Sequence, residues 1–577
     1  MKKGAYFGFG CLTSVLLVVL LVTITIVSSV KMIKKDVVVI NNNSLLTLDI
    51  SGPIVEYSRF ANDRFFNNQT TVFDIIDAIK KAKNDPRIDG ILLKPELVMC
   101  GYASLNEIIE AIEDFKSAKK VVISYITIAS NADLLLASTA DEIVISSGSS
   151  AGIFLRGFGV DMAFYKNMLD KIGVEMHVIS AGKFKDYGTQ YSKDYMSEET
   201  KANLNRVLKS RYELYVNQLS EQLNVSSIVI ESIINEEKYM FLDPKETIMT
   251  GMVQRSAFES AFKKEQEQRF KHVIDSKKYL LGFKAKDNKK LNEKIAVLYL
   301  NGNIMPVGND FSVLSSKWIN ETVEDILKNK SIKGCVLRVN SGGGSALESE
   351  EILEILKQLK EKMPVVVSMG DVAASGGYMI SMAGDKVYAD PYTVTGSIGV
   401  VQIVPDAKKL QDKLGVTHEK LEYGKKSTWL NPLNGVSDKQ KSAMKASADV
   451  VYDSFKKIVM NGRSGKFNTL EEVEAVAQGQ VWDALTAKEN GLIDEIGSLK
   501  DAINEAARLA TVTEYSRQNY PTRKDFFQLF LTEKMGLAEM KSILLKGTSE
   551  TLYQQKLMLD NFTNHSMQTI LPVEFEK

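Results

Sequence analysis

Runs of apolar residues alternate with amphipathic stretches along most of the chain. LLTLDISGPI, from Leu45, and KIAVLYLNGNI, from Lys294, each predict a strand that ends in a turn at a glycine. Apolar residues recur at helical spacing over 104–115 and 348–359, which predicts two amphipathic helices. Strands that alternate with helices in this way predict parallel α/β layers.

The two strand patterns begin an internal repeat of about 244 residues, a period that indicates a duplicated domain rather than a solenoid. LLLASTADEIVIS, which ends at Ser146, matches MISMAGDKVYADP, so that Asp141 falls opposite Asp385. We therefore expect a first domain over 37–262 and a second domain over 294–512. The segment 263–293 between them is rich in Lys, Gln and Glu, and we expect a solvated helix or a linker there.

The N-terminus has a different pattern. From Gly4 to Val30 no residue carries a charge, and this run is long enough to span a bilayer. It ends in SSVKMIKK without the small-residue cleavage site of a signal peptide. We therefore expect residues 1–36 to be an uncleaved membrane anchor, with the bulk of the chain exported.

Composition changes this picture only a little. A length of 577 residues is too great for one ordinary core, so two or more domains are expected. The chain has 72 basic and 72 acidic residues, and this balance gives no argument for binding nucleic acid. Its three cysteines form neither a disulfide framework nor a zinc signature. We expect no metal or cofactor.

Ser375 is the leading candidate for a reactive residue. It lies between a β-branched strand pattern, 365–367, and a short apolar helix pattern, 378–382, and two glycines follow it directly. A serine at a strand-to-helix turn can project its hydroxyl, and the free N–H groups at the helix start can hold an oxyanion. A packed turn of small residues is the alternative explanation.

The duplication offers an internal comparison for this serine. Counting back from the two matched aspartates places Asn131 of the first copy opposite Ser375, with Ser130 one register off. The second copy has a glycine cluster, Val339-Asn-Ser-Gly-Gly-Gly-Ser345, where the first copy has no glycines. The paired loss indicates a decayed site in the first copy.

A reactive serine needs a base. None of the four histidines lies in a motif, although a Ser-His-Asp triad stays open. The other possibility is a Ser-Lys dyad, in which burial lets a lysine lose its proton near neutral pH. In Ser180-Ala-Gly-Lys-Phe-Lys-Asp, Lys183 falls opposite Lys425 of the second copy, whereas Lys185 falls opposite Ser427. The second copy thus keeps the serine and lacks this lysine, while the first copy shows the reverse.

These motifs carry a family resemblance. AASGGYMIS, TGSIGV, RVNSGGGS and SAGKFKD, in a duplicated chain with an N-terminal anchor, resemble the long, two-domain form of the signal peptide peptidase A family, also called protease IV. The resemblance extends to about residue 512. It implies tandem ClpP/crotonase-like α/β domains and a membrane-anchored Ser/Lys endopeptidase that degrades cleaved signal peptides in the bacterial envelope.

The resemblance also implies roles for individual residues. Ser375 is the expected nucleophile, Lys185 the general base, and Ser397 the serine that holds this lysine. The expected oxyanion donors are the N–H groups of Gly343 and Gly344, together with that of Gly376. One departure is Gly342, where the family often has proline.

The expected partners follow from the same resemblance. They are peptide substrates, a lipid bilayer contacted through residues 4–30, and further copies of the chain in a ring-like tetramer; no nucleic acid is expected. The expected location is the inner (cytoplasmic) membrane, with the catalytic bulk on the extracytoplasmic side. An apolar helical stripe over 526–545, in a C-terminal extension spanning 513–577, is typical either of core or subunit packing or of a peptide-binding or membrane-contacting surface.

Two other classes of function stay open. One is a non-catalytic, membrane-anchored scaffold that keeps the fold, and the joint presence of Ser375, Lys185 and Ser397 argues against it. The other is a crotonase-type acyl-CoA enzyme. That chemistry gives no reason for a serine and a lysine that are divided between two copies.

Overall fold

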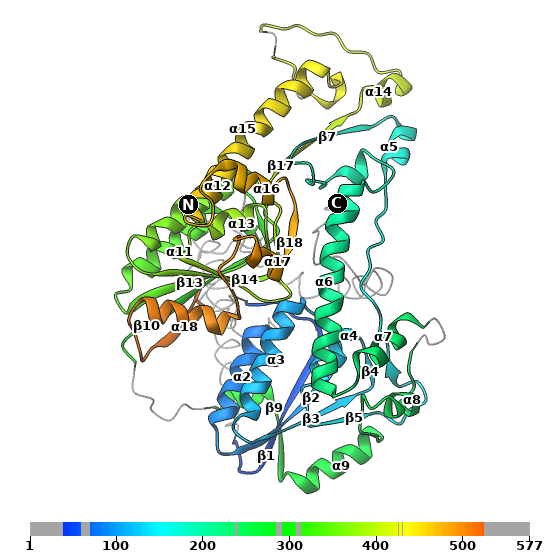
Figure 1. Cartoon of the computed structure of the whole chain (residues 1–577), viewed down its shortest axis with the longest axis vertical. Helices are drawn as coiled ribbons and strands as arrows, with labels where there is room; N and C mark the ends of the chain where they lie inside the picture. Colours follow the sequence, from blue (N-terminus) through cyan, green and yellow to red (C-terminus); the bar gives the residue numbers. More distant parts are fainter. Residues whose placement is uncertain are drawn as a thin grey trace, which may run out of the picture.

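The computed structural model describes residues 39–58, 70–236, 241–283, 291–306, 313–424, 426–429 and 431–523. These residues form two α/β halves in tandem (Figure 1). We call residues 39–283 the first copy and residues 291–523 the second copy. Each half contains its own sheet with helices packed against it, which confirms the predicted α/β class.

The first copy is built on a six-stranded sheet with the order β8-β5-β3-β2-β1-β9, in which every neighbouring pair is parallel. Its strands are β1 (Ser44–Pro53), β2 (Ile88–Met99), β3 (Val121–Ile126), β4 (Ile128–Ala129), β5 (Glu142–Ile145), β6 (Gly152–Ile153), β7 (Glu175–Ala181), β8 (Arg255–Ser256) and β9 (His272–Asp275). Its helices are α2 (Val72–Asn84), α3 (Tyr102–Lys116), α4 (Asn131–Ala137), α5 (Lys166–Ile172), α6 (Glu198–Leu223), α7 (Ser227–Asn235), α8 (Pro244–Met249), α9 (Glu259–Arg269) and α10 (Ser276–Gly282).

The second copy repeats this plan with the strand order β18-β16-β14-β13-β10-β20, and only the β16–β18 pair is antiparallel among the described strands of this sheet. Its strands are β10 (Lys294–Asn301), β11 (Asn303–Ile304), β12 (Val313–Leu314), β13 (Ile332–Ser341), β14 (Val365–Ala374), β15 (Lys386–Ala389), β16 (Val394–Gly396), β17 (Val400–Asp406), β18 (Val481–Asp483), β19 (Glu495–Ile496) and β20 (Ser516–Tyr520). Its helices are α11 (Ser316–Lys328), α12 (Ala346–Lys360), α13 (Gly376–Ser381), α14 (Lys408–Leu414), α15 (Asp438–Gly462), α16 (Leu470–Val476), α17 (Ala484–Glu489) and α18 (Leu499–Leu509).

The charged segment after residue 262 begins as the solvated helix α9, and up to residue 283 it is part of the first copy rather than a linker between the copies. β9 pairs in parallel with β1, with His272 opposite Ser44. α9 buries only Phe262 and Gln266, and its other faces are polar. The helix therefore has the composition of a solvated segment even though Phe262 stacks on Tyr125 in the core.

The start of the predicted C-terminal extension is likewise not helical. Residues 516–520 form β20, which pairs in parallel with β10 at the edge of the second sheet. The apolar stripe over 526–545 and the predicted anchor over 4–30 lie outside the described residues. Within the parts of the chain that the structure describes, no helix combines the length and apolar character needed to cross a membrane.

One small sheet joins the two copies. β7 of the first copy and β17 of the second pair antiparallel, from Ala181 opposite Val400 to Glu175 opposite Asp406. These strands lie with α5 and α14 in a projecting arm at the top of the view in Figure 1. Because the chain leaves β7 at Ala181, the residues that follow it are held against the second copy.

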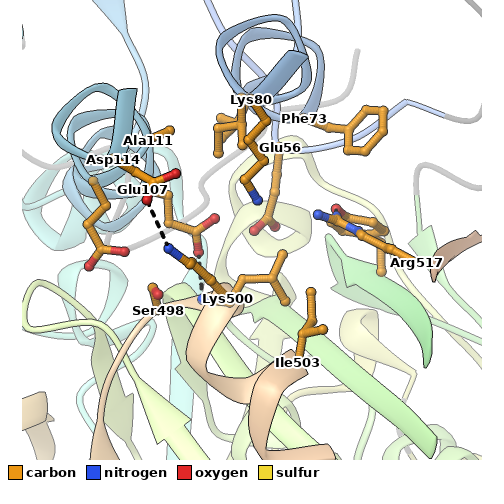
Figure 2. Close-up of a pocket in the computed structure, with 15 residues that line it drawn as sticks. Glu56, Phe73, Lys80, Glu107, Ala111, Asp114, Ser498, Lys500, Ile503 and Arg517 are labelled. Carbon is orange, nitrogen blue, oxygen red and sulfur yellow. Dashed lines mark hydrogen bonds and ion pairs between the residues drawn. The ribbon is translucent and has the colours of Figure 1, made fainter. Parts of the chain in front are cut away.

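The copies also meet between α2 and α3 on one side and α18 and β20 on the other. They enclose a small pocket there, which Figure 2 shows in close-up. Acidic side chains from α3 and basic side chains from the second copy face each other across it, as in the ion pair between Asp114 and Lys500 (3.5 Å).

Candidate active site

Ser375 occupies the turn between β14 and α13. Its φ of 54° and ψ of −120° form a combination that residues other than glycine rarely adopt. Its N–H donates to the Gly396 carbonyl at 2.9 Å, beside the β14–β16 pairing. Backbone strain of this kind persists only where the surroundings fix it, and it concentrates at functional sites. The neighbouring residues Ala374 and Gly376 are buried, whereas Ser375 stays partly exposed and within reach of a substrate.

Lys185 reaches this turn from the other copy. Its Nζ lies 3.0 Å from Ser375 Oγ, 2.9 Å from Ser397 Oγ and 2.8 Å from the Ser397 carbonyl oxygen. The Lys185 residue is only 7% exposed. The structure thus brings together three of the predicted residues across sequence separations of 190 and 212 positions.

Burial lowers the pKa of the Lys185 amine from 10.5 to about 7. Loss of water around the ammonium is the cause, since desolvation disfavours the charged form. The three hydrogen-bond partners of the amine are neutral oxygens, which do not restore the charge. A large fraction of the amine is therefore neutral near pH 7.

The two lysines of the SAGKFKD motif have different environments. Lys183 has a side chain that is 62% exposed, and its amine lies 3.3 Å from Glu199 at the surface. Its predicted counterpart, Lys425, lies outside the described residues, and Ser427, the predicted counterpart of Lys185, is exposed. Only the second lysine of the motif lies in the site.

Two glycines allow the Lys185 loop to lie against the second copy. The Phe184 N–H donates to the Gln478 carbonyl at 2.7 Å. A Cβ on Gly182 would overlap the Gln478 backbone, and a Cβ on Gly479 would overlap the Lys185 backbone. Both glycines also have positive φ values, +116° and +80°. Our sequence reasoning missed Gly479, whose only signal is a Gln-Gly turn dipeptide.

The glycine cluster after β13 packs directly on the serine turn. A Cβ on Gly343 would lie 2.5 Å from the Gly376 nitrogen, and one on Gly344 would overlap the Ile304 carbonyl. The Gly343 N–H donates to Ser341 Oγ at 3.1 Å. Within the described parts of the chain, no acceptor takes a hydrogen bond from the Gly344 or Gly376 N–H. These two amides are free to bind an anion.

The counterpart of Ser375 in the first copy is Ser130, and the register that placed Asn131 there is wrong by one residue. Both serines stand at the N-cap position of the helix that follows, α4 or α13, but only the Ser130 side chain makes a capping hydrogen bond. Ser130 has an ordinary extended backbone, and its Oγ donates to Asp133 at 2.6 Å. The Asp133 carboxylate also accepts the Val98 N–H at 2.9 Å, so it fills the position beside the turn. The first copy kept its serine as a helix cap.

The same strand pairing identifies what stands opposite Ser397 in the first copy. Ala129 pairs with Ile153, as Ala374 pairs with Gly396, so Phe154 takes the equivalent position. A phenyl ring cannot accept a hydrogen bond from a lysine amine as a hydroxyl does. The first copy therefore lacks this polar partner as well.

The histidine alternative gains no geometric support. In the described segments no histidine hydrogen-bonds Ser375. His177 lies on β7 with Nε2 3.5 Å from an Asp406 carboxylate oxygen, and His418 is exposed.

Comparisons with known proteins identify the family of this chain. The model of Peptidase family S49 matches residues 113–273 and 357–513. "Protease 4" of Haemophilus influenzae is 31% identical over 512 residues, covering 85% of this chain and 81% of that protein. "Serine protease SPPA, chloroplastic" of Arabidopsis thaliana is 29% identical over 489 residues, covering 82% and 70%.

Among solved structures, a mutant of ClpP1 from Listeria monocytogenes is 14% identical and covers 36% of this chain and 94% of its own, with a TM-score of 0.23. The family match covers both copies, and its relatives are named as proteases. The chain therefore belongs to Peptidase family S49 and is a serine protease.

Proposed function

We propose that Ser375 is the nucleophile and Lys185 the general base of a dyad assembled across the two copies. The observation that carries this proposal is the 3.0 Å approach of the Lys185 amine to Ser375 Oγ in a buried site. A nucleophile and a base within hydrogen-bond reach, with a third group that orients the base, is the usual arrangement of covalent catalysis. Ser397 is the orienting group.

The three contacts of the amine match the neutral form of lysine. A neutral amine has two N–H donors and one lone pair. The Ser397 carbonyl oxygen can only accept, so it takes one N–H, and Ser397 Oγ can take the other. The lone pair is then directed to the Ser375 hydroxyl, which donates its proton as Oγ attacks the peptide carbonyl.

The charge that develops on the carbonyl oxygen needs donors in place before the reaction. We assign this role to the free N–H groups of Gly344 and Gly376. Gly343, predicted as a third donor, gives its N–H to Ser341 and instead shapes the loop. Lys185 next donates its proton to the leaving amine, and water resolves the acyl-enzyme in the reverse sequence.

The proposed substrates are extended apolar peptides, including cleaved signal peptides. The support for these substrates is the family resemblance. We also propose that the uncharged run over 4–30 anchors the chain in the inner membrane, with the catalytic bulk outside the cytoplasm. We also propose the ClpP/crotonase-like fold for each copy. Its support is the repeated order of strands and helices in the two sheets.

We further propose a homo-oligomer, a tetramer by resemblance. The projecting arm supports this proposal because it carries large apolar side chains that are exposed in the single chain. Contiguous exposed apolar surface commonly marks an interaction site. These side chains are Met168, Ile172, Leu414, Val416, Leu421 and Tyr423.

The test of the dyad is peptide hydrolysis by the full chain in detergent micelles, beside Ser375→Ala, Lys185→Ala and the matched control Lys183→Ala. We expect the first two variants to lose activity by at least about 10³-fold and the control to keep it, because dyad members act as a unit. A fluorophosphonate probe should label Ser375 in the control. Full activity in Lys185→Ala would overturn the assignment of the base.

A further inference from the structure

A site divided between two copies depends on the contacts that hold the copies together. Helix α3 of the first copy lies against β13 and β14 of the second copy, the strands that lead to the oxyanion loop and to Ser375. Figure 2 shows α3 residues from Glu107 to Asp114 along the pocket between the copies. Of the contacts that α3 makes with β13 and β14, the one at its first turn lies closest in sequence to Ser375.

That contact is made by Asp371, four residues before Ser375. Its Oδ1 accepts the Ala103 N–H at 2.9 Å and the Ser104 N–H at 3.2 Å, and its Oδ2 accepts the Ser104 hydroxyl at 2.7 Å. Asp371 is 8% exposed. A carboxylate is favourable at this end of a helix because the first N–H groups have no partners within the helix.

Helix α3 has no cap of its own. The capping position is Gly101, which has no side chain, and its φ of −70° is one that any residue can adopt. A Cβ at this position would overlap the carboxylate carbon of Asp371. The glycine is therefore required for space rather than for backbone conformation, and the cap comes from the other copy.

Asp371 also lies where β14 changes its pairing. Met369 stands opposite Val339 and Ala373 stands opposite Ser341, so three residues of β14 face one residue of β13. Before this bulge β14 pairs with β15, and after it β14 pairs with β16. Bulges bend a strand and re-aim the side chains beyond them. The direction of this bend sets where Ser375 lies.

A second contact holds the neighbouring strand. Arg338 of β13 is fully buried, and its guanidinium pairs with Glu107 of α3 at 2.7 Å and with Glu56. It also donates to Ser368 Oγ on β14 at 2.8 Å. Helix α3 therefore contacts both strands of the second copy that end in the site.

We propose that Asp371 is a positioning residue for Ser375, held by hydrogen bonds from the N-terminus of α3. The first copy then fixes the nucleophile turn in addition to supplying the lysine. This proposal rests on the proposed dyad. The strained backbone of Ser375 needs surroundings that fix it, and at Asp371 helix α3 of the first copy holds the strand that leads to this turn. Without the hydrogen bonds between Asp371 and α3, the Ser375 turn relaxes and Ser375 Oγ moves away from Lys185.

The test uses the full chain in detergent micelles and four variants. Asp371→Ala removes the carboxylate that accepts the hydrogen bonds of α3. Gly101→Ala places a methyl group of the first copy where that carboxylate lies and so displaces it. Ser104→Ala removes one donor with little change in packing, and Asp371→Asn keeps an acceptor for the two backbone N–H groups. Lys500→Ala is the matched control, because it removes a contact at the opposite end of α3 without touching β14.

We measure kcat and KM for a peptide, the rate at which a fluorophosphonate phosphonylates Ser375 with loss of fluoride, and the thermal unfolding temperature. Asp371→Ala and Gly101→Ala are expected to lower kcat and the phosphonylation rate about tenfold with KM within about twofold, since small misplacements of reacting groups are costly. Ser104→Ala should lower both about threefold, and Asp371→Asn should lie near the unmodified chain. The double variant Gly101→Ala/Asp371→Ala should be no slower than Asp371→Ala, because both act through one contact.

The proposal is overturned if folded Gly101→Ala or Ser104→Ala retains the full kcat and phosphonylation rate, or if Asp371→Asn is as slow as Asp371→Ala. An equal loss in Lys500→Ala would also overturn it, because any weakening of the interface would then suffice. If Asp371→Ala does not fold, the kcat of Ser104→Ala still tests the proposal. Failure of the dyad is seen separately, as full activity in Lys185→Ala.

Discussion

The pH dependence of acylation tests the buried lysine most directly. The pKa of Lys185 is lowered from 10.5 to about 7, which corresponds to a shift of roughly 5 kcal/mol toward the neutral amine relative to a lysine in water. With a pKa of about 7, about half of the sites hold a neutral base at pH 7. With the ordinary value of a lysine, only about one in 3,000 would do so.

The assay mimics the acylation step: it measures the rate at which an uncharged fluorophosphonate phosphonylates Ser375, with loss of fluoride, between pH 5 and pH 10. Because only the neutral amine accepts the serine proton, the rate should rise about tenfold per pH unit below pH 6, bend near pH 7 and stay level above pH 8. A rate that is flat from pH 5 to pH 8, or one that still rises tenfold per unit at pH 9, would refute the buried-lysine reasoning. Lys183→Ala should leave the curve unchanged, because that lysine is exposed.

The lowered pKa of Lys185 also determines how the free energy of unfolding changes with pH. Between pH 7 and 10.5 the unfolded chain carries a proton on this lysine that the folded chain does not, so unfolding becomes harder as the pH rises through this range. Lys185→Met removes the cost of burying the amine. It should therefore be more stable than the unmodified chain near pH 7, by about 1–3 kcal/mol, and the gain should shrink at pH 10. Equal stability of the two chains at pH 7 in urea titrations would count against a desolvated amine.

Three further outcomes are expected. Gly479→Ala should lower kcat at least about tenfold, measured on folded protein, because its Cβ would overlap the backbone of Lys185. Ser341→Ala should lower kcat several-fold at constant KM in peptide hydrolysis, since the Gly343 N–H loses the acceptor that fixes the oxyanion loop. Arg338→Met should lower the free energy of unfolding by about 3–5 kcal/mol in urea titrations, because two buried glutamates lose their cation.

The interface between the copies explains why a first copy without a working nucleophile keeps so much of the fold. Its serine turn became a helix cap, and the Asp133 carboxylate fills the position beside it. Its loop after β7 supplies Lys185, and its α3 contacts both strands that end in the site. The first copy thus contributes to the site of the second copy in two ways: its loop after β7 supplies the lysine, and its α3 holds the two strands.

Much of this protein was readable from local pattern. The strands that begin at Ser44 and Lys294 and the helices around 104–115 and 348–359 were predicted because buried strands and amphipathic helices leave strong periodic signals. The repeat made Lys185 stand out as the lysine without a counterpart. Where the signal is weak, elements were missed, because β9 and β20 are short edge strands.

The sequence by itself determined the α/β class, the duplication, and the residue types of the site, because periodicity and motif spacing are properties of short segments. It could not determine the exposure of Lys185, the free or occupied state of each glycine N–H, or the contact between Asp371 and α3. The exposure of Lys185 and the contact of Asp371 depend on segments 190 or more positions apart meeting in space, and the glycine N–H groups depend on how the loop after β13 folds. Burial lowers the pKa of a lysine only when a second surface removes its water, and only the tertiary structure brings that surface to Lys185.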